Sequence, residues 1–253
     1  MAKKQKKKKP LLFRFIKRTV KFFHGKKEFI GLENLPEGPC IIVGNHSQMY
    51  GPILAAVGMP FKSSVWCVGE MMNKKESAAY AYEDFWSRKS KATRWFYKLI
   101  SKIVGPFLCW LFNNLECIPV YKDMRALTTY KLTVQEFEKG KPVLIFPEER
   151  TPYNEIINNF QERYVETCKI YHKRTGKELS IVPMYYAVNL DKILFGKPIK
   201  FDSTIDLKVQ MSDISRYVME EITALAKSLP PHKVVPYDNV SKRKYKWSKE
   251  KSA

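Results

Sequence analysis

The sequence predicts a single-domain α/β sandwich in which helices flank a mixed, mostly buried sheet. Short apolar runs of the kind found in buried strands alternate with longer amphipathic stretches along most of the chain. The 253 residues are 45% hydrophobic, which is enough for one domain with a full core. We expect this domain to span residues 29–229, between a basic N-terminal segment, 1–28, and a basic C-terminal tail, 230–253.

The charge of the chain predicts an anionic partner. The formal net charge is +20, from 45 Lys and Arg residues against 25 Asp and Glu residues. Such an excess favours nucleic acid, a membrane surface or a phosphorylated substrate. The five cysteines stand far apart without a CxxC pair or a metal-ligand spacing, so we expect free thiols in a reducing compartment and no metal site.

The N-terminal segment combines a lysine run with a predicted amphipathic helix. Between Leu11 and Phe23, basic residues recur on one helical face and large apolar residues on the other. Charges interrupt the apolar stretch, which excludes a signal peptide and a membrane span. A basic helix with large aromatic side chains is typical of one lying in the membrane interface, where each Lys or Arg contributes about 1 kcal/mol. The alternatives are a nucleic-acid-binding arm and a helix packed on its own domain.

The first predicted strand, 40–43, leads into the stretch Gly-Asn-His-Ser-Gln-Met-Tyr-Gly-Pro, residues 44–52, and a short helix is expected after it. His46 therefore lies on a loop at the carboxyl end of a strand, where open α/β sheets usually bind ligands. A neutral imidazole there can remove a proton from a hydroxyl group that attacks a carbonyl. The simpler interpretation is a loop histidine without chemistry, because one short motif is weak evidence.

The middle of the chain contains its most hydrophobic stretch. A second strand is predicted at 64–68 and a charged, aromatic helical insertion beside the site at 73–91. In the stretch 95–112, two lysines interrupt the apolar sequence and Gly105-Pro106 predicts a break or kink. We therefore expect a buried or interfacial helix pair here rather than a membrane span.

Further strands and helices alternate to the end of the domain. Strands are expected at 116–120, 142–146, 180–187 and 199–201, and helices at 126–139, 160–175 and 211–229. Pro183 predicts that its strand lies at an edge or carries a bulge. From His232 the chain is basic and poor in apolar residues, which predicts a loose tail.

Polar side chains follow three of these strands. They are His46, the turn Lys122–Arg125 and the turn Glu148–Thr151. Together they supply a base, several cations and carboxylates. This set suits a hydroxyl nucleophile on a substrate with an anionic group, because the cations can hold a phosphate while proximity contributes much of the rate.

The order of these segments resembles the glycerolipid acyltransferases, the lysophosphatidic acid acyltransferase family, over roughly residues 30–229. The first block of that family is Asn-His with an Asp after four further residues, and Asn45-His46 matches it. The second block is an apolar strand leading to a phosphate-binding Arg. Here Lys122 stands at the basic position, with Arg125 nearby.

Two further blocks continue the resemblance. Phe146-Pro147-Glu148 matches the start of Phe-Pro-Glu-Gly-Thr-Arg, although Glu149-Arg150-Thr151 replaces the last three residues. The apolar strand with Val-Pro is matched at 181–184, and the turn at 196–199 also looks like the family.

Gly51 stands where the family has its Asp. In the family this carboxylate holds the imidazole in the correct tautomer, and loss of such a group costs about 10⁴ in rate in the serine-protease model. Glu148 is the first candidate to replace it, with Glu149 and Glu155 as second choices. A backbone carbonyl or a water molecule is the alternative. Lys122 in place of Arg keeps the charge but loses the bidentate fork.

The resemblance implies an O-acyltransferase that needs no cofactor beyond its acyl donor. It would move a fatty acyl group from acyl-CoA or acyl-carrier protein to the hydroxyl of a lysophospholipid or glycerol-phosphate-type acceptor. His46 would be the general base, and Glu148 would position the acceptor or orient His46. The substrate-binding residues would be Asn45, Lys122, Arg125 and Arg150. With the basic N-terminal helix, this predicts a peripheral protein at an anionic membrane surface, on the cytoplasmic face.

Two rival functions are compatible with the sequence. A catalytically silent family member would bind lipid or acyl-carrier protein without turnover, as Gly51 suggests. A nucleic-acid-binding protein would explain the charge, but the basic residues cluster at the two ends rather than interleave with aromatic residues, so nucleic acid is not the expected partner. A Gly-x-Ser-x-Gly elbow is missing, which argues against a serine hydrolase.

Overall fold

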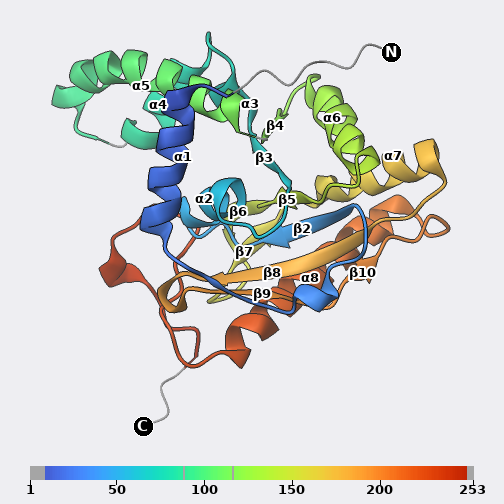
Figure 1. Ribbon diagram of the computed structural model, residues 1–253. Coiled ribbons are helices and arrows are strands. Elements are labelled where there is room, and N and C mark those ends of the chain that lie inside the picture. The colour runs from blue at the N-terminus through green and yellow to red at the C-terminus, as the bar shows by residue number, and fades with distance from the viewer. Residues whose placement is uncertain (1–8, 88, 116, 250–253) are drawn as a thin grey trace. The chain divides into compact units, whose positions relative to one another are not determined.

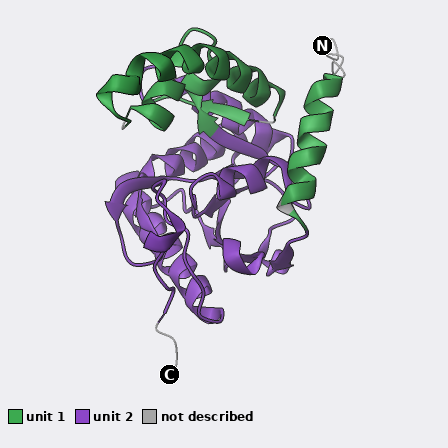
Figure 2. Cartoon of the chain, turned by 90° about the vertical axis from the view of Figure 1, so that its left-hand side faces the viewer, with its two compact units in different colours: residues 1–25, 67–121 green, residues 26–66, 122–253 purple. Residues whose placement is uncertain are grey.

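The computed structural model describes residues 9–249 except Arg88 and Glu116, and it divides into two compact units (Figures 1 and 2). Unit 1 consists of Met1–Gly25 and Cys67–Tyr121, and unit 2 of Lys26–Trp66 and Lys122–Ala253. These boundaries differ from the three segments that the sequence predicts. The lysine run before residue 9 lies outside the described residues.

Unit 2 is built on a mostly parallel sheet with the strand order β1–β9–β8–β2–β5–β3 and with β10 beside β8. The strands are β1 (Glu28–Ile30), β2 (Cys40–Gly44), β3 (Ser64–Val68), β5 (Val143–Ile145), β8 (Ser180–Ala187), β9 (Lys192–Phe195) and β10 (Ile199–Lys200). β2 pairs in parallel with β5 and β8, whereas β8 is antiparallel to β9 and β10. The predicted α/β fold, a mixed sheet flanked by helices, is confirmed.

The centre of this sheet is the core of unit 2. Every residue of β2 is buried, as expected for a parallel strand with both faces covered. Ile42 lies opposite Leu144 on one side and Val182 on the other, and all three are fully buried. This register brings the carboxyl ends of β2 and β5 to the same edge of the sheet.

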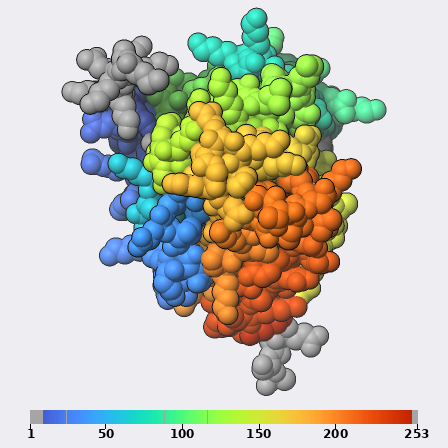
Figure 3. All heavy atoms as spheres, turned by 90° about the vertical axis from the view of Figure 1, so that its right-hand side faces the viewer, coloured from blue at the N-terminus to red at the C-terminus, as the bar shows by residue number. Residues whose placement is uncertain are grey.

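In the described part of unit 2, four α-helices and a small hairpin accompany the sheet. The helices are α2 (Tyr50–Val57), α6 (Ala126–Glu138), α7 (Glu166–Thr175) and α8 (Leu207–Ser228), and the hairpin pairs β6 (Glu148–Pro152) with β7 (Asn158–Phe160). Short 3₁₀ helices lie at Leu32–Asn34, Glu162–Val165, Val188–Leu190 and Lys242–Lys244. The side chains of α6, α7 and α8 cover one face of this unit side by side (Figure 3).

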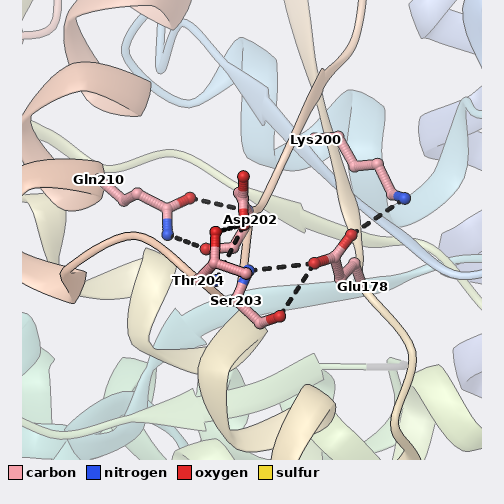
Figure 4. Close-up of polar contacts among 6 residues, drawn as sticks. All are labelled: Glu178, Lys200, Asp202, Ser203, Thr204 and Gln210. Atoms are coloured by element: carbon pink, nitrogen blue, oxygen red, sulfur yellow. Dashed lines mark hydrogen bonds and ion pairs between the residues drawn. The ribbon is translucent and has the colours of Figure 1, made fainter.

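A surface network joins β10 to the start of α8 (Figure 4). The Glu178 carboxylate accepts a hydrogen bond from the Ser203 main-chain N–H at 3.0 Å and pairs with Lys200 at 3.0 Å. These groups, the Ser203 N–H first, lower the pKa of Glu178 to about 2. Gln210 accepts from the Asp202 main-chain N–H at 2.8 Å, so the turn before α8 is fixed at several points.

Pro183 does not lie on an edge strand, so of the two predicted alternatives, an edge or a bulge, the edge is wrong. β8 lies inside the sheet, between β2 and β9. The Pro183 carbonyl accepts a hydrogen bond from Gly196, the residue after β9, at 2.8 Å. Proline has no N–H to donate to a neighbouring strand. At Pro183 this donor is missing on the side of β8 that faces the connection between β9 and β10, where there is no strand to pair with, so β8 can contain a proline.

The C-terminal segment, defined here as residues 230–249, is packed, and the prediction of a loose tail is wrong for it. His232, Val234 and Val235 are buried. The Val234 N–H donates to the Lys246 carbonyl at 2.8 Å, which closes the segment on itself. Composition misled here because main-chain hydrogen bonds, rather than many apolar side chains, hold the segment.

Unit 1 contains the helices α1 (Leu11–His24), α3 (Gly69–Met72), α4 (Ser77–Trp86) and α5 (Arg94–Asn114), the 3₁₀ helix Lys91–Thr93 and the strand β4 (Cys117–Val120). In the strand order β4 follows β3, which ends in this unit. α1 is the amphipathic helix that the sequence predicts. Phe13 is buried with its ring edge-on to Trp110, at 6.3 Å between centroids, while most of its other large apolar side chains are exposed.

α5 continues through Gly105-Pro106 as one helix, so the predicted break and the helix pair expected from it are wrong. Pro106 removes only one helical N–H. Gly105 lets α4 approach so closely that a Cβ there would lie 2.5 Å from the Cα of Ala78, and this packing supports the helix. The segment Lys91–Asn114 is, among the described residues, the one helix long and apolar enough to cross a membrane by length and composition alone. One such helix is weak evidence for a span.

Candidate active site at the ends of β2 and β5

Two sequence blocks 102 residues apart meet at the carboxyl ends of β2 and β5. Val43 of β2 pairs with Ile145 of β5, and His46 and Glu148 each follow three residues later. The Glu148 Oε1 accepts a hydrogen bond from the His46 main-chain N–H at 2.6 Å. The parallel register therefore brings the Asn-His block and the Phe-Pro-Glu block together.

Glu148 is a buried carboxyl group held by main-chain donors. Its side chain reaches the His46 N–H through Oε1 and the Asn158 N–H through Oε2, at 3.1 Å. Burial raises the pKa of Glu148 to about 7, and the two N–H groups oppose that rise. Both hydrogen bonds that the structure gives this carboxylate go to backbone groups, so it fixes the His46 main chain rather than the imidazole.

The His46 imidazole is held by aromatic packing. Its ring lies edge-on to Phe146, at 5.9 Å between centroids, and to Tyr237, at 5.2 Å. Its Nδ1 is buried and finds no hydrogen-bond partner among the described residues. Burial lowers the pKa of His46, with the Gln48 backbone acting in the opposite direction. The ring is therefore neutral near pH 7, as a general base must be.

Gly51 occupies a position with no room for a side chain. A Cβ there would lie 2.7 Å from the Asn45 carbonyl oxygen, 2.8 Å from the His46 carbonyl oxygen and 2.9 Å from Cε1 of Phe146. The Gly51 N–H also donates to the His46 carbonyl at 3.1 Å. The family's Asp could not be accommodated here without movement of the backbone that carries His46.

Asn45 ties the loop to β8. It is 2% exposed, and its Oδ1 accepts from the Tyr186 N–H at 2.7 Å. Its Nδ2 donates to the Tyr186 carbonyl at 3.2 Å and to Ser47 Oγ at 2.6 Å. Because the amide is engaged with protein groups, its place in the structure is that of a loop anchor.

Ser47 and Gln48 follow in left-handed backbone conformations, with φ of 47° and 55°. Two consecutive residues of this kind, neither of them glycine, are uncommon and cluster at functional sites in proteins. Hydrogen bonds from the C-terminal segment hold this conformation. The Gln48 N–H donates to the Pro236 carbonyl at 3.0 Å, and Nε2 donates to the carbonyls of Asp238 at 3.2 Å and Val240 at 3.1 Å.

The predicted cations lie on the surface of unit 2. Lys122 and Arg150 are exposed, and Arg125 pairs with Asp123 at 2.7 Å. The structure thus brings Asn45, His46 and Glu148 together, whereas Lys122 and Arg150 face solvent and Arg125 is paired with Asp123.

The second-choice carboxylates are engaged elsewhere. Glu149 accepts a hydrogen bond from Thr151 Oγ1 at 2.8 Å, and Glu155 pairs with Lys227 at 2.8 Å. The residues that sequence reasoning missed are Tyr237 and the other members of the C-terminal segment. A sequence separation of about 190 residues from the His46 loop left no local signal for this contact.

No family model and no curated protein matches the sequence. Among solved structures, the chain is similar to a 1-acyl-sn-glycerophosphate (LPA) acyltransferase. This is the crystal structure of PlsC from Thermotoga maritima, with 13% sequence identity and a TM-score of 0.48 over 89% of this chain and 84% of that one. The likeness is one of backbone arrangement and does not by itself assign an activity.

Proposed function

We propose that the chain is an O-acyltransferase that works at a membrane surface. It transfers a fatty acyl group from acyl-CoA or acyl-carrier protein to the hydroxyl of a lysophospholipid or glycerol-phosphate-type acceptor. The observation that carries this proposal is the meeting of the Asn45-His46 and Phe146-Pro147-Glu148 blocks at one edge of the sheet, with the 2.6 Å hydrogen bond between His46 and Glu148. The sequence resemblance expects these blocks to form one site.

In this reaction His46 is the general base. Its neutral imidazole takes the proton of the acceptor hydroxyl as the oxygen attacks the thioester carbonyl. The new C–O bond forms, the C–S bond breaks, and the imidazolium returns the proton to the leaving thiolate. We assign Nε2 as the base, since Nδ1 is buried. No covalent acyl-enzyme is required.

The exposed cations suit the anionic part of the acceptor. We assign Lys122, with Arg125 or Arg150, to the phosphate group. Lys122 and Arg150 are exposed and accessible to a headgroup, whereas Arg125 is half-buried and paired with Asp123. A lysine binds phosphate as a point charge, whereas an arginine binds it through a planar fork. The acceptor phosphate should therefore be held less rigidly than in the family pattern.

Unit 1 supports association with a membrane surface. Five large apolar side chains of α1 are between 57% and 81% exposed: Leu11, Leu12, Phe15, Phe22 and Phe23. α5 exposes a second set: Trp95, Phe96, Leu99, Ile103 and Phe107. Exposed apolar groups beside Lys and Arg on α1 suit a helix lying in the interface of an anionic leaflet, and we assign the cytoplasmic face.

A second candidate function is a catalytically silent protein that binds lipid or acyl-carrier protein. The packing around Gly51 favours such a silent protein, because there is no room at position 51 for the carboxylate that would orient the histidine. The buried Nδ1 of His46, which has no hydrogen-bond partner among the described residues, also favours a silent protein, because catalytic histidines usually have that nitrogen fixed by a hydrogen bond.

The experiment is acyl transfer by the purified chain in mixed micelles. Acyl-CoA and acyl-carrier protein are offered against a panel of lysophospholipids and glycerol phosphate. His46→Ala should abolish transfer, while His172→Ala, a histidine of α7 that also has a buried Nδ1, should retain it. Transfer at equal trace rates in the wild type and His46→Ala would instead support the silent binder.

A further inference from the structure

The C-terminal segment lies against the His46 loop, and it supplies one of the two aromatic rings that contact the imidazole. We propose that Tyr237 is a positioning residue for His46, and that the C-terminal segment is the part of the fold that supplies the orientation usually given by a carboxylate. The catalytic consequence of this proposal rests on the proposed function, whereas the orientation of the ring does not.

The imidazole is fixed from two sides. Phe146 comes from the residue after β5 and Tyr237 from the C-terminal segment, with interplanar angles to His46 of 77° and 69°. Edge-to-face contacts of this kind favour one ring orientation. Nδ1 has no hydrogen-bond partner among the described residues. Beside the effect of the Gln48 backbone on the ring, these two aromatic contacts are therefore the interactions that set the ring plane.

The available carboxylates do not perform this task. Glu148, which contacts the His46 backbone, accepts hydrogen bonds from the main-chain N–H groups of His46 and Asn158 and from no imidazole nitrogen in the described structure. Gly51 has no side chain, and the surrounding carbonyl oxygens exclude one. A different device must hold the imidazole if it acts as a base.

The backbone beside His46 depends on the same segment. The left-handed conformation of Ser47 and Gln48 is costly, at about 1–3 kcal/mol for each residue. Three carbonyl groups of the C-terminal segment accept hydrogen bonds from Gln48, and Tyr245 OH donates to Gln48 Oε1 at 3.3 Å. The C-terminal segment therefore stabilises, through several hydrogen bonds, the loop conformation from which the imidazole projects.

The base of the segment is itself anchored in the core of unit 2. Tyr185 OH and His232 Nε2 lie 2.8 Å apart, and both side chains are buried. Ser248 is fully buried, and its N–H donates to the His232 carbonyl at 2.9 Å. Residues 232 and 248 thus close a loop whose outer part carries Tyr237, so Tyr237 is held on a fixed base.

Histidine side-chain NMR on the full chain tests this proposal without requiring turnover. In ¹⁵N-histidine-labelled protein, His46→Ala assigns the His46 signals, and their tautomer and pKa are then measured. In Tyr237→Ala, we expect a mixture of tautomers and a His46 pKa that rises toward its ordinary value, because the ring gains solvent and freedom. Tyr237→Phe keeps the aromatic packing and should restore the wild-type signals.

Kinetics give the second readout. Tyr237→Ala should lower kcat by about tenfold to a hundredfold with little change in KM, as expected for a misplaced catalytic group. Tyr217→Ala, a truncation of a tyrosine on α8, serves as the matched control and should change neither readout. His46 signals in Tyr237→Ala that match the wild type would overturn the proposal, even if thermal stability falls. If wild-type transfer is not observed, the proposed function fails, and the NMR result still decides the positioning role.

Discussion

The Glu148 carboxylate accepts a hydrogen bond from the main-chain N–H of His46, with 2.6 Å between Oε1 and N. This contact joins the ends of two parallel strands and sets the backbone from which the imidazole projects. The carboxyl group is 5% exposed, so its ionisation is linked both to the stability of the fold and to the geometry of the candidate base.

The first prediction concerns the stability of the chain against pH. The folded-state pKa of Glu148 is about 7, above its ordinary value of 4.5, so the fold favours the protonated form. That contribution is complete below pH 4.5 and is lost as the pH rises through 7. Compared with Glu148→Gln, the wild type should therefore lose about 2.5 kcal/mol of unfolding free energy between pH 5 and pH 8. Urea unfolding at both pH values measures this.

Glu178→Gln is the control for this measurement. The pKa of Glu178 is held at about 2, so that carboxylate stays ionised across the whole window. The difference in unfolding free energy between Glu178→Gln and the wild type should be the same at pH 5 and pH 8. A Glu148→Gln difference that is equally constant would show that the buried carboxyl does not titrate near neutrality.

The second prediction is that an Asp placed at position 51, where the acyltransferase pattern has one, does not improve transfer. In Gly51→Asp the new Cβ meets backbone carbonyl oxygens at 2.7 and 2.8 Å, so the His46 loop must move. We expect a loss of about 1–3 kcal/mol of stability and no gain in transfer rate. Gly51→Ala should show most of the stability loss, whereas Gly38→Ala, with no atoms within 4 Å of its Cβ, should show little. A faster Gly51→Asp enzyme with an unchanged Tm would mean that the position is open to a carboxylate.

The positions of His46 and Glu148 could be predicted because both depend on local sequence. Continuous apolar runs mark buried parallel strands, and residues after such strands gather at one sheet edge. The contact of Gln48 and Tyr237 across the His46 loop could not be predicted, because a basic, apolar-poor segment carries no periodic signal. The lack of room for a side chain at Gly51 could not be predicted either, since it depends on how closely the carbonyl oxygens of Asn45 and His46 pack against it in three dimensions.

Long-range packing also explains the errors in secondary structure. Pro106 in an isolated helix favours a break, but close packing of Gly105 on α4 keeps α5 continuous. Pro183 favours an edge, but the chain turns between β9 and β10 beside it. In both places tertiary contacts outweigh the local preference of proline.

The third prediction concerns the pH dependence of transfer. Burial lowers the pKa of His46 below its ordinary value of 6.5. On the proposed function His46 is the general base and acts when neutral, so kcat/KM should fall on the acid side with a midpoint below pH 6.5. In Glu148→Gln, which removes the buried carboxyl group with a pKa of about 7 beside the His46 backbone, the fall in kcat/KM on the acid side should remain. If the fall in kcat/KM at acid pH disappears in Glu148→Gln, the titrating group is Glu148 rather than His46.

The last prediction concerns membrane binding by unit 1. Phe22 and Phe23 are 79% and 81% exposed at the end of a basic helix, so they are available to the apolar part of a leaflet. Phe22→Glu/Phe23→Glu removes this apolar area and adds like charge to an anionic surface, and it should weaken binding by at least about tenfold. Co-sedimentation with phosphatidylcholine vesicles, with and without phosphatidylserine, measures this.

A double substitution in unit 2, Ile205→Glu/Val209→Glu, is the matched control for that measurement, since these side chains are also about half exposed, at 48% and 51%. It adds the same charge at partly exposed apolar positions outside unit 1, so it should bind vesicles as the wild type does. Binding by the wild type should also require phosphatidylserine and weaken with salt, because the basic face of α1 contributes through screened charges. If both double variants bind vesicles equally well, α1 does not contact the membrane, and the exposed apolar side chains of α5 are the next surface to test.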